Sequence, residues 1–471
     1  MLVVKNLNLS YPKSEQFLKD ISFQVEEGEA VLLAGLSGSG KSSILNAING
    51  IAKNYDECSI SGEVLYNGRN LLDEKMYKIA SLISTVFQNP KTHFFNVDTT
   101  RELLFYLENI GVKREEMKKR LDALLTLFPI SHLLDRSIFD LSGGEKQILC
   151  IASAYISGNK IIMLDEPSSN LDEKYTEILR TMLTVLKEKR ITLIIAEHRL
   201  YYVRDIIDKV ILIKNGIIEQ TFTGNEFFTE TDEFFSKNGL RSPRKTALKK
   251  PFIKTALLES IPNDGLFIKN LQYNFTKKRG LEVKHILFNF GKIYGIVGKN
   301  GCGKSTFIKS LIGLLKKSQE EIFLDGRKLS KNARIKISSL VMQDVNHQLF
   351  TDSLKNELLL NNEEARPEVD GVLERLSLLA YKERHPMSLS GGQKQRLAIA
   401  QVALSRKSIV CFDEPTSGMD YKHCLEIAFI IQSLKKSNTI ILIISHDTEF
   451  LNLTVDEVVN VENWAKTIER K

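Results

Sequence analysis

The chain contains two copies of one long sequence pattern, and this repeat restricts the possible folds more than any other feature. Five short segments occur twice, in the same order, along the 471 residues. The pairs are VKNLNLSY (4–11) with IKNLQYNF (268–275), GLSGSGKSS (35–43) with GKNGCGKST (298–306), LSGGEKQ (141–147) with LSGGQKQ (389–395), IIMLDEPSSNLD (161–172) with IVCFDEPTSGMD (409–420), and IIAEH (194–198) with LIISH (442–446). Because a long internal repeat marks a repeated structural unit, the pattern predicts one domain present twice.

The distances between the repeated segments support the same fold in both copies. From the serine of LSGG to the aspartate of the DEP segment there are 23 residues in each copy, and from that aspartate to the final histidine there are 33. Upstream the copies differ, since the lysine of the glycine-rich segment precedes the LSGG serine by 101 residues in the first copy and by 86 in the second. We therefore expect about fifteen extra residues in loops or helices of the first copy.

The first and last repeated segments place a first domain at 1–225, a linker at 226–265 and a second domain at 266–471. The linker holds Ser242-Pro243 and the segment PNDG (262–265), which are typical of turns. Such turn signals indicate a short connection between the domains.

Short apolar segments alternate with segments of helical length. Two of them directly precede a glycine-rich loop, at 30–34 and 293–297. Others of strand length lie at 160–164, 191–196, 408–412 and 439–445. Fully apolar strands alternating with helices predict an α/β fold with a mostly parallel sheet covered on both faces.

The bulk composition excludes few functions. The chain has 65 basic and 58 acidic side chains, and this mild excess does not by itself indicate nucleic-acid binding. One segment, RSPRKTALKKPFIK (241–254), holds six basic residues and no acidic one. A solvated linker is the favoured interpretation of this run, and contact with an anionic surface is the alternative.

Cysteine usage and hydropathy indicate a reduced environment and no membrane span. The five cysteines include no CxxC pair, a pattern that fits free thiols rather than disulfides or a zinc site. No window reaches ~20 consecutive apolar residues, and the N-terminal segment lacks the layout of a signal peptide. We expect any membrane component to be supplied by a partner.

The glycine-rich segments match the phosphate-binding P-loop pattern GxxxxGK[ST]. Gly35, Gly38 and Gly40 let the backbone curl so that its N–H groups and the following helix N-terminus face an anion. Lys41 is expected to reach the terminal phosphates and Ser42 to coordinate Mg²⁺. The same roles in the second copy are predicted for Gly298, Gly301, Gly303, Lys304 and Ser305.

An apolar strand followed by Asp-Glu occurs in each copy. Asp165 and Asp413 end their strands, where a carboxylate can hold Mg²⁺ through water. Glu166 and Glu414 follow directly and could act as general bases toward an attacking water. The pattern predicts a hydrolytic phosphate site.

The LSGG segments predict a second device for binding anions. Ser142, Gly143 and Gly144 are expected to open a helix, presenting a hydroxyl and free N–H groups at its N-terminus. The equivalents are Ser390, Gly391 and Gly392. Two anion sites per domain suggest that ATP is sandwiched between domains.

Together the P-loop, LSGG[EQ]KQ, the DEP strand and the following EH or SH resemble the nucleotide-binding domain of ABC ATPases, twice and over nearly the whole chain. The resemblance implies a P-loop NTPase fold with a helical subdomain in each copy. It also implies that the two copies pair head to tail within one chain, with ATP and Mg²⁺ as cofactors.

The resemblance also implies roles for individual residues. Tyr11 and Phe275 would stack on adenine, with core aromatics as the alternative, and the remaining P-loop side chains would contact nucleotide. Those P-loop residues are Ser37, Ser39, Ser43, Asn300, Cys302 and Thr306. Gln88 and Gln343 would contact Mg²⁺, His198 and His446 the γ-phosphate, and Asp172 and Asp420 would lie at the domain interface.

The implied catalytic arrangement has two composite sites. Site one uses Lys41, Ser42, Gln88, Asp165, Glu166 and His198, closed by Ser390 and Gly392. Site two uses Lys304, Ser305, Gln343, Asp413, Glu414 and His446, closed by Ser142 and Gly144. Because neither copy has lost a catalytic residue type, we expect both sites to be competent.

Among ABC ATPases the chain resembles the fused ATPase of energy-coupling-factor (ECF) importers. The features are two complete domains with a short linker, QNP (88–90) followed by Phe94 and Phe95, HQLF (347–350), and EHR (197–199). The chain departs from that pattern at 344–345, where Asp-Val replaces Asn-Pro, and at 91–93. The resemblance implies a transmembrane coupling protein and a substrate-binding membrane protein as partners, at the cytoplasmic face of the cell membrane, with no nucleic acid.

Two other interpretations remain open. A ribosome-associated ABC ATPase is also duplicated, although such proteins have a long charged helical linker, and the basic run at 241–254 favours it. A fused ATPase of another importer, for example one for sugars, is the third. The transported substrate, whether a vitamin, a precursor or a metal ion, cannot be deduced from the residues.

Overall fold

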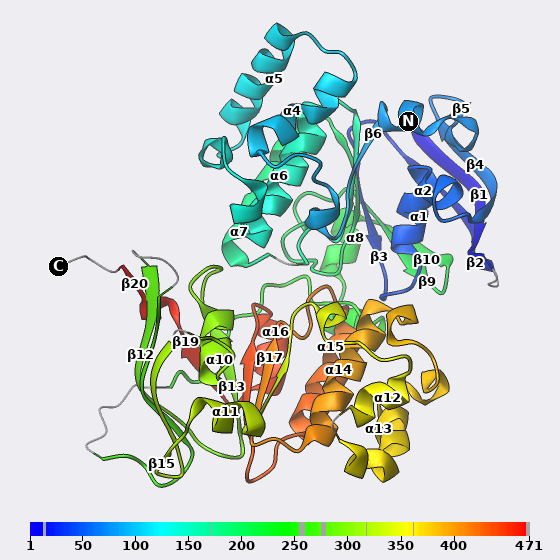
Figure 1. Cartoon of the computed structure of the whole chain (residues 1–471). Coiled ribbons are helices and arrows are strands. Elements are labelled where there is room, and N and C mark those ends of the chain that lie inside the picture. Colours follow the sequence, from blue (N-terminus) through cyan, green and yellow to red (C-terminus); the bar gives the residue numbers. More distant parts are fainter. Residues whose placement is uncertain are drawn as a thin grey trace. The chain divides into compact units, whose positions relative to one another are not determined.

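The structure is a computed structural model that describes the whole chain except residues 13–15, 170, 254–259, 275–278, 317, 361 and 468–471. The chain forms two compact units (Figure 1). The first comprises Met1–Lys245 with Gly418–Lys422, and the second comprises Thr246–Ser417 with His423–Lys471. Each unit holds one copy of the repeat, apart from the five residues of the second copy that belong to the first unit.

A mostly parallel sheet forms the centre of the first unit, as predicted. Its strand order is β10-β9-β3-β8-β7-β6, and only the β10–β9 pair is antiparallel. The bounds are β3 (Ala30–Ala34), β6 (Ile83–Val86), β7 (Ile161–Asp165), β8 (Thr192–Ala196), β9 (Lys209–Lys214) and β10 (Ile217–Thr223). The apolar runs at 30–34, 160–164 and 191–196 are therefore strands.

A second, antiparallel sheet covers part of this unit, and we did not predict it. Its order is β2-β1-β4-β5, with bounds β1 (Leu2–Ser10), β2 (Gln16–Val25), β4 (Ser59–Tyr66) and β5 (Arg69–Asn70). Buried and exposed side chains roughly alternate along β1, as expected of a sheet with one wet face. The segment at 4–11 lies mostly in β1 and its repeat at 268–275 mostly in β11, so the repeated pattern corresponds to the same strand in the two antiparallel sheets.

The central sheet separates two hydrophobic cores. On one face Val31 and Leu33 of β3 pack with the antiparallel sheet and the P-loop helix. On the other face Ala30, Leu32 and Ala34 of the same strand pack with the long helices. Because successive side chains of a strand point to opposite faces, a fully apolar strand is what a sheet covered on both sides requires.

Helices complete the first unit, and α4, α5 and α6 form the helical subdomain (Figure 1). The bounds are α1 (Lys41–Ile48), α2 (Ile51–Asn54), α3 (Met76–Ala80), α4 (Thr99–Asn109), α5 (Arg114–Leu127), α6 (Gly143–Ile156), α7 (Glu173–Glu188), α8 (Gly224–Thr229) and α9 (Asp232–Lys237).

The second unit repeats this architecture. Its parallel sheet has the order β16-β17-β18-β13-β19, and its antiparallel sheet the order β15-β14-β11-β12-β20. The strand bounds are β11 (Leu266–Asn274), β12 (Arg279–Phe288), β13 (Lys292–Val297), β14 (Ser318–Leu324), β15 (Arg327–Lys328), β16 (Ser338–Val341), β17 (Ile409–Asp413), β18 (Ile440–Ile444), β19 (Glu457–Asn460) and β20 (Ala465–Thr467). The apolar runs at 293–297, 408–412 and 439–445 are thus strands as well.

The helices of the second unit are shorter where the sequence has fewer residues. They are α10 (Lys304–Leu311), α11 (Lys331–Ile337), α12 (Leu354–Leu359), α13 (Val369–Arg375), α14 (Gly391–Ser405), α15 (Tyr421–Ser433) and α16 (Thr448–Thr454). In the helical subdomains, α4 and α5 have 11 and 14 residues, whereas α12 and α13 have 6 and 7. From the first residue of α4 or α12 to the LSGG serine there are 43 residues in the first copy and 36 in the second, so about half of the extra residues of the first copy lie in its helical subdomain.

Residues 226–245 fold with the first unit, so that unit extends beyond the boundary that we placed at 225. Phe227 and Phe228 of α8 and Phe235 of α9 are buried in its core. Phe227 makes edge-on contacts with Phe228 and Phe235. Burial of three aromatic side chains explains why this stretch is not a free linker.

The basic run at 241–254 is solvated at Arg244 and Lys245, whose side chains are 59% and 61% exposed, as we favoured, but its first residue is buried. Arg241 is only 6% exposed, and its Nε donates to the carbonyl of Met419 at 2.9 Å. Arg244 pairs with Asp232 at 2.9 Å, and Lys245 pairs with Glu173. Residues 241–245 of the run therefore belong to the first unit.

Within the described residues no helix is long and apolar enough to cross a membrane. The five cysteines are free thiols. Burial raises the pKa of Cys150 and Cys411 above the usual value, which keeps both thiols protonated.

Arg334 closes the C-terminal end of the second P-loop helix, α10. Its side chain is almost fully buried, and Nη1 donates to the carbonyls of Ser310 and Leu311 at 2.8 and 2.9 Å. Nη2 pairs with Glu320, which is also largely buried. A cation at this end complements the helix dipole and the unpaired carbonyls.

We expect Arg334→Ala to destabilise the second unit by about 3–5 kcal/mol, because it strands the buried Glu320 carboxylate and two carbonyls. Urea unfolding followed by hydrogen exchange of each unit would measure this loss. Arg366→Ala removes only an exposed pair with Glu363 and serves as the control, with an expected cost below about 1 kcal/mol. If both variants lost the same free energy of unfolding, Arg334 would not stabilise the second unit through its contacts at the end of α10.

Candidate functional site

The first P-loop connects β3 to α1 through glycines in left-handed conformations. Gly35, Gly38 and Gly40 have φ angles of 152°, 77° and 112°. A Cβ on Gly35 would lie 2.3 Å from the carbonyl oxygen of Ile213, so only glycine fits there. Gly40 is the N-cap of α1, and the loop thus leads into a helix N-terminus suited to an anion.

Lys41 folds back across this loop. Its Nζ donates to the carbonyls of Gly35 and Leu36 at 2.9 Å each, and lies 3.4 Å from Nε2 of His198. Burial lowers the pKa of Lys41, while the charges of Glu166 and Asp420 oppose that effect. The ammonium is therefore held inside the loop, where it would neutralise a bound phosphate.

Ser42 and Asp165 form an oxygen pair at the end of β7. The Ser42 hydroxyl donates to Oδ1 of Asp165 at 3.0 Å. Burial, with the nearby charge of Glu166, raises the pKa of Asp165 to about 6. Oxygen ligands of this kind suit Mg²⁺, which is often held by one or two carboxylates together with substrate phosphates. The described residues contain no cluster of three or more His, Cys, Asp or Glu that could hold a metal alone, so phosphate oxygens would have to complete the shell.

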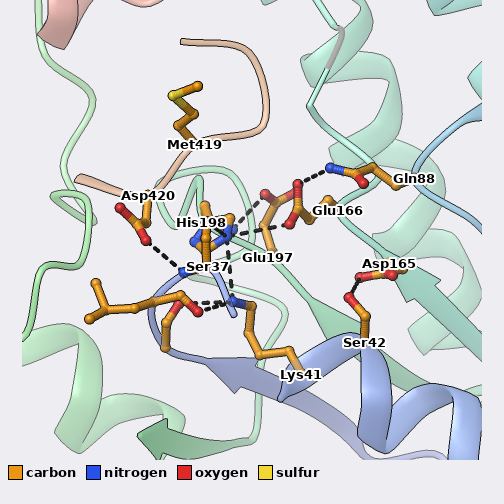
Figure 2. A network of polar contacts seen from close by, with 12 residues as sticks. Ser37, Lys41, Ser42, Gln88, Asp165, Glu166, Glu197, His198, Met419 and Asp420 are labelled. Atoms are coloured by element: carbon orange, nitrogen blue, oxygen red, sulfur yellow. Dashed lines mark hydrogen bonds and ion pairs between the residues drawn. The ribbon is translucent and has the colours of Figure 1, made fainter. Parts of the chain in front are cut away.

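Glu166 lies at the meeting point of the remaining groups (Figure 2). Gln88 donates from Nε2 to Oε2 of Glu166 at 2.6 Å, and Nε2 of His198 lies 3.4 Å from Oε1. Burial opposes ionisation of Glu166, but the charge of His198 and the hydrogen bonds from His198 and Gln88 outweigh it and lower the pKa. An ionised, partly shielded carboxylate is suited to accept a proton from water.

The backbone of this glutamate is strained in both units. Glu166 has φ 45° and Glu414 has φ 51°, in the left-handed region that side chains rarely adopt. Each backbone N–H is held by a neighbouring strand, Glu166 by the carbonyl of Ala196 at 2.8 Å and Glu414 by that of Ile444 at 2.9 Å. Strain at the same place in two copies is characteristic of a functional position.

Glu197 belongs to the EH and EHR segments noted in the sequence, but no role at the site was predicted for it. It is 2% exposed, and its carboxylate accepts the backbone N–H groups of His198 at 2.7 Å and Arg199 at 3.0 Å. Tyr202 donates its hydroxyl at 2.6 Å, and burial together with the Glu197 charge raises the pKa of Tyr202 well above its usual value. The signal was an acidic residue directly after a fully apolar strand. In the second copy Ser445 takes this place, and its hydroxyl accepts from Asp447 at 3.1 Å.

A loop of the second copy contributes to the first unit's site (Figure 2). The backbone N–H of Ser37 donates to Oδ2 of Asp420 at 2.6 Å. A Cβ on Gly418 would lie 3.1 Å from Nε2 of Gln88, so the loop passes close to the Gln88–Glu166 pair. Gly239 accepts the Tyr421 N–H at 3.2 Å, beside the Arg241 contact described above.

The second unit assembles the corresponding residues. Lys304 donates to the carbonyls of Gly298 and Lys299 at 2.8 and 3.1 Å and lies 2.9 Å from Nε2 of His446. That histidine also lies 2.8 Å from Oδ1 of Asn300 and 3.6 Å from Oε1 of Glu414. Gly301 and Gly303 are left-handed like their counterparts, with φ angles of 77° and 103°.

The Mg²⁺ ligands predicted for the second unit are placed like those of the first. Burial raises the pKa of Asp413, and its hydrogen bond with Ser305 acts against the shift. Gln343 follows β16 as Gln88 follows β6. Cys302 is half-buried in the P-loop, and Thr306 lies on α10.

Both LSGG serines cap a helix, as predicted. Ser142 accepts the N–H of Glu145 at 3.2 Å, and Glu145 accepts the N–H of Ser142 at 2.8 Å. Ser390 and Gln393 make the same reciprocal pair at the start of α14. Gly143, Gly144, Gly391 and Gly392 form the first turns of α6 and α14. Asp172 caps α7 and accepts the N–H of Tyr175 at 2.9 Å.

The two aromatics proposed to stack on adenine are not equally placed. The hydroxyl of Tyr11 lies 2.7 Å from that of Ser43, and its ring packs edge-on against Phe17. Tyr11 is half-buried by these contacts with Ser43 and Phe17, and its stacking on adenine stays a prediction. Phe275 lies outside the described residues. Ser39, which follows Gly38 in the loop, is buried.

Comparisons with known proteins agree with this geometry. A family model described as ABC transporter matches residues 18–169 and 283–417. A putative ABC transporter ATP-binding protein of Treponema denticola is 39% identical, covering 98% of this chain and 95% of the relative. One from Sulfurisphaera tokodaii is 33% identical, covering 98% and 96%. The solved archaeal ribosome recycling factor aABCE1, in complex with the ribosomal stalk protein aP1, is 23% identical, with TM-score 0.59 over 95% of this chain and 86% of its own, which is evidence of fold alone.

We expect Asp165→Asn to stabilise the nucleotide-free, Mg²⁺-free protein at alkaline pH. An acid whose pKa rises on folding is easier to protonate in the folded state, so its ionisation costs stability. The loss of folding stability caused by ionised Asp165 is absent below pH ~3.8 and complete above pH ~6. The rise of the pKa on folding corresponds to a loss of about 2–3 kcal/mol.

Urea unfolding at pH 8 and pH 4.5 measures this effect. The free energy of unfolding of Asp165→Asn should be clearly larger than that of the wild type at pH 8. At pH 4.5 the difference should be much smaller. Asp205→Asn, at a highly exposed position, is the matched control and should change neither value. Lower stability of Asp165→Asn at pH 8 would show that the carboxylate does not oppose folding.

Proposed function

The chain belongs to the ABC transporter family of ATP-binding proteins, and we propose that it energises an ECF-type importer for a vitamin, a vitamin precursor or a metal ion. As a member of this family it is an ATPase with two nucleotide-binding domains. The observation that carries the importer proposal is a pair of exposed aromatics. Phe95 and Phe350 follow the two Q-loop glutamines at the same distance in each copy.

These two phenylalanines are presented to solvent although they are large and apolar. Phe95 is 77% exposed and Phe350 is 74% exposed. Phe95 stacks on Phe105 of α4, with ring centroids 5.2 Å apart. Val97 nearby is 61% exposed. Exposed apolar groups at one place in both copies favour a hydrophobic partner surface, and the helices of a transmembrane coupling protein have that chemistry.

The chemistry that we propose for each site starts from ionised Glu166 and Glu414. Each carboxylate accepts a proton from the water that attacks the γ-phosphate, and Gln88 orients Glu166 through its amide. Lys41 and Lys304 would neutralise phosphate oxygens, and His198 and His446, whose Nε2 atoms lie 3.4 and 2.9 Å from the lysine Nζ atoms, would contact the γ-phosphate beside them. Mg²⁺ bound by Ser42 and Asp165, or by Ser305 and Asp413, would neutralise charge on the phosphates.

We further propose that ATP closes the two domains on each other. Ser390 and Gly392 would complete the site of Lys41, and Ser142 and Gly144 would complete that of Lys304. Closure would move the Q-loop regions and the membrane helices bound there, and hydrolysis followed by phosphate release would reopen the pair. A substrate-binding membrane protein would select the cargo, and the chain would act at the cytoplasmic face of the membrane.

Both sites are expected to turn over. Glu166→Gln and Glu414→Gln, made separately, should each lower kcat for ATP at least twofold while ATP binding is retained, because the amide cannot accept the proton. Phosphate release and fluorescent-nucleotide binding measure the two quantities. Glu173→Gln, at an exposed position, is the control. Loss of activity in only one of the two variants would mean that the other site is inactive.

The importer proposal predicts that small hydrophobic membrane proteins co-purify with the tagged chain from gently solubilised cells. Phe95→Ala/Phe350→Ala should lose them because it removes the exposed apolar contacts, while its basal ATPase stays within twofold. Tyr77→Ala, at another exposed aromatic (67%), is the control and should retain them. Recovery of ribosomal proteins without a membrane protein would overturn the importer proposal in favour of a ribosome-associated ATPase.

A further inference from the structure

The two copies use different side chains for one contact beside the Q-loop. His93 in the first unit and Gln348 in the second lie five residues after Gln88 and Gln343. Both accept a hydrogen bond from the backbone N–H of the residue just before the glutamine. Two unlike side chains that make one contact indicate that the contact itself is required.

In the first unit the acceptor is an imidazole nitrogen. Nε2 of His93 accepts the N–H of Phe87 at 2.7 Å, and the two rings pack with centroids 4.9 Å apart. Accepting at Nε2 requires the neutral ring with its proton on Nδ1. Burial lowers the pKa of His93 to about 4, so the ring is neutral at physiological pH.

In the second unit an amide performs the same task. Oε1 of Gln348 accepts the N–H of Met342 at 2.7 Å, and its Nε2 donates to the carbonyl of Leu340 at 2.7 Å. Leu340 lies in β16 and Met342 follows that strand directly. The side chain therefore ties the departing loop to the end of its strand.

In each unit a short segment runs from the Q-loop glutamine to the exposed phenylalanine. A buried carboxylate holds the end of this segment that carries the phenylalanine. Glu102 accepts the backbone N–H groups of Phe95 and Asn96 at 3.1 and 2.8 Å. Glu357 accepts those of Phe350 and Thr351 at 2.9 Å each. Both glutamates are at most 5% exposed. The turn between the Q-loop glutamine and the exposed phenylalanine is thus held at both ends.

We propose that His93 and Gln348 are positioning residues for the two catalytic sites, acting through the backbone that carries Gln88 and Gln343. Gln88 reaches Glu166 at 2.6 Å only while its loop keeps this path. Without the acceptor, the N–H of Phe87 or Met342 loses its partner and the loop can move. The glutamine then leaves the catalytic carboxylate. This role concerns ATP hydrolysis and does not depend on the importer proposal.

The test compares His93→Ala/Gln348→Ala with the exchange variant His93→Gln/Gln348→His in the full chain. We expect the alanine pair to lower kcat for ATP about fivefold, the factor that corresponds to one lost hydrogen bond. The exchange variant should stay within twofold of wild type because each new side chain can still accept the N–H group. His132→Ala/Gln319→Ala, at exposed positions, is the matched control.

Two further readouts separate positioning from loss of structure. The alanine pair should raise the half-saturating Mg²⁺ concentration severalfold, because Gln88 and Gln343 are moved, while KM for ATP changes less than twofold. If the alanine pair does not fold, His93→Ala and Gln348→Ala are measured singly with the same expectations. Unchanged kcat in the alanine variants, or an exchange variant as slow as they are, would overturn the proposal.

Discussion

The buried ammonium of each P-loop lysine is the charge around which the rest of each site is arranged. Lys41 is 4% exposed and Lys304 is 7% exposed. A buried cation is costly unless it is hydrogen-bonded and compensated by opposite charge. The P-loop backbone supplies carbonyls for this purpose, and the ends of the parallel strands supply the carboxylates. The sheet order, with β3 beside β8 and β8 beside β7, therefore brings phosphate-binding and catalytic residues to one edge.

Sequence patterns predicted the parts of the fold that depend on local chemistry. The strand at 30–34, the glycines around Lys41 and the capping serines Ser142 and Ser390 follow from apolar runs, left-handed φ angles and helix capping. The antiparallel sheet was missed because its alternating strands give a weaker signal than fully apolar ones. The end of the first domain was placed too early because the phenylalanines of α8 and α9 find their core only in three dimensions.

Contacts made by side chains to backbone groups were the hardest part of the site to predict. Glu197 and Ser445 occupy one position in the two copies, yet both organise the residues that follow the strand. A backbone N–H can donate to any suitable acceptor, so such positions tolerate different residue types. The EH and SH segments therefore show that the position varies without indicating its role, whereas groups expected to touch phosphate, such as Lys41 and Lys304, are the same in both copies.

The first unit is not continuous in sequence, because Gly418–Lys422 belongs to it. During synthesis, about 170 further residues are added between Lys245, the end of the unit's first segment, and Gly418, the start of this loop. At ~5–20 residues per second, that delay lasts roughly 10–30 seconds. During this interval the first P-loop is already made, but Ser37 still lacks the Asp420 carboxylate, and Arg241 lacks the carbonyl of Met419. The nascent chain thus passes through a stage in which its first nucleotide site is incomplete, and synthesis of the second copy ends that stage.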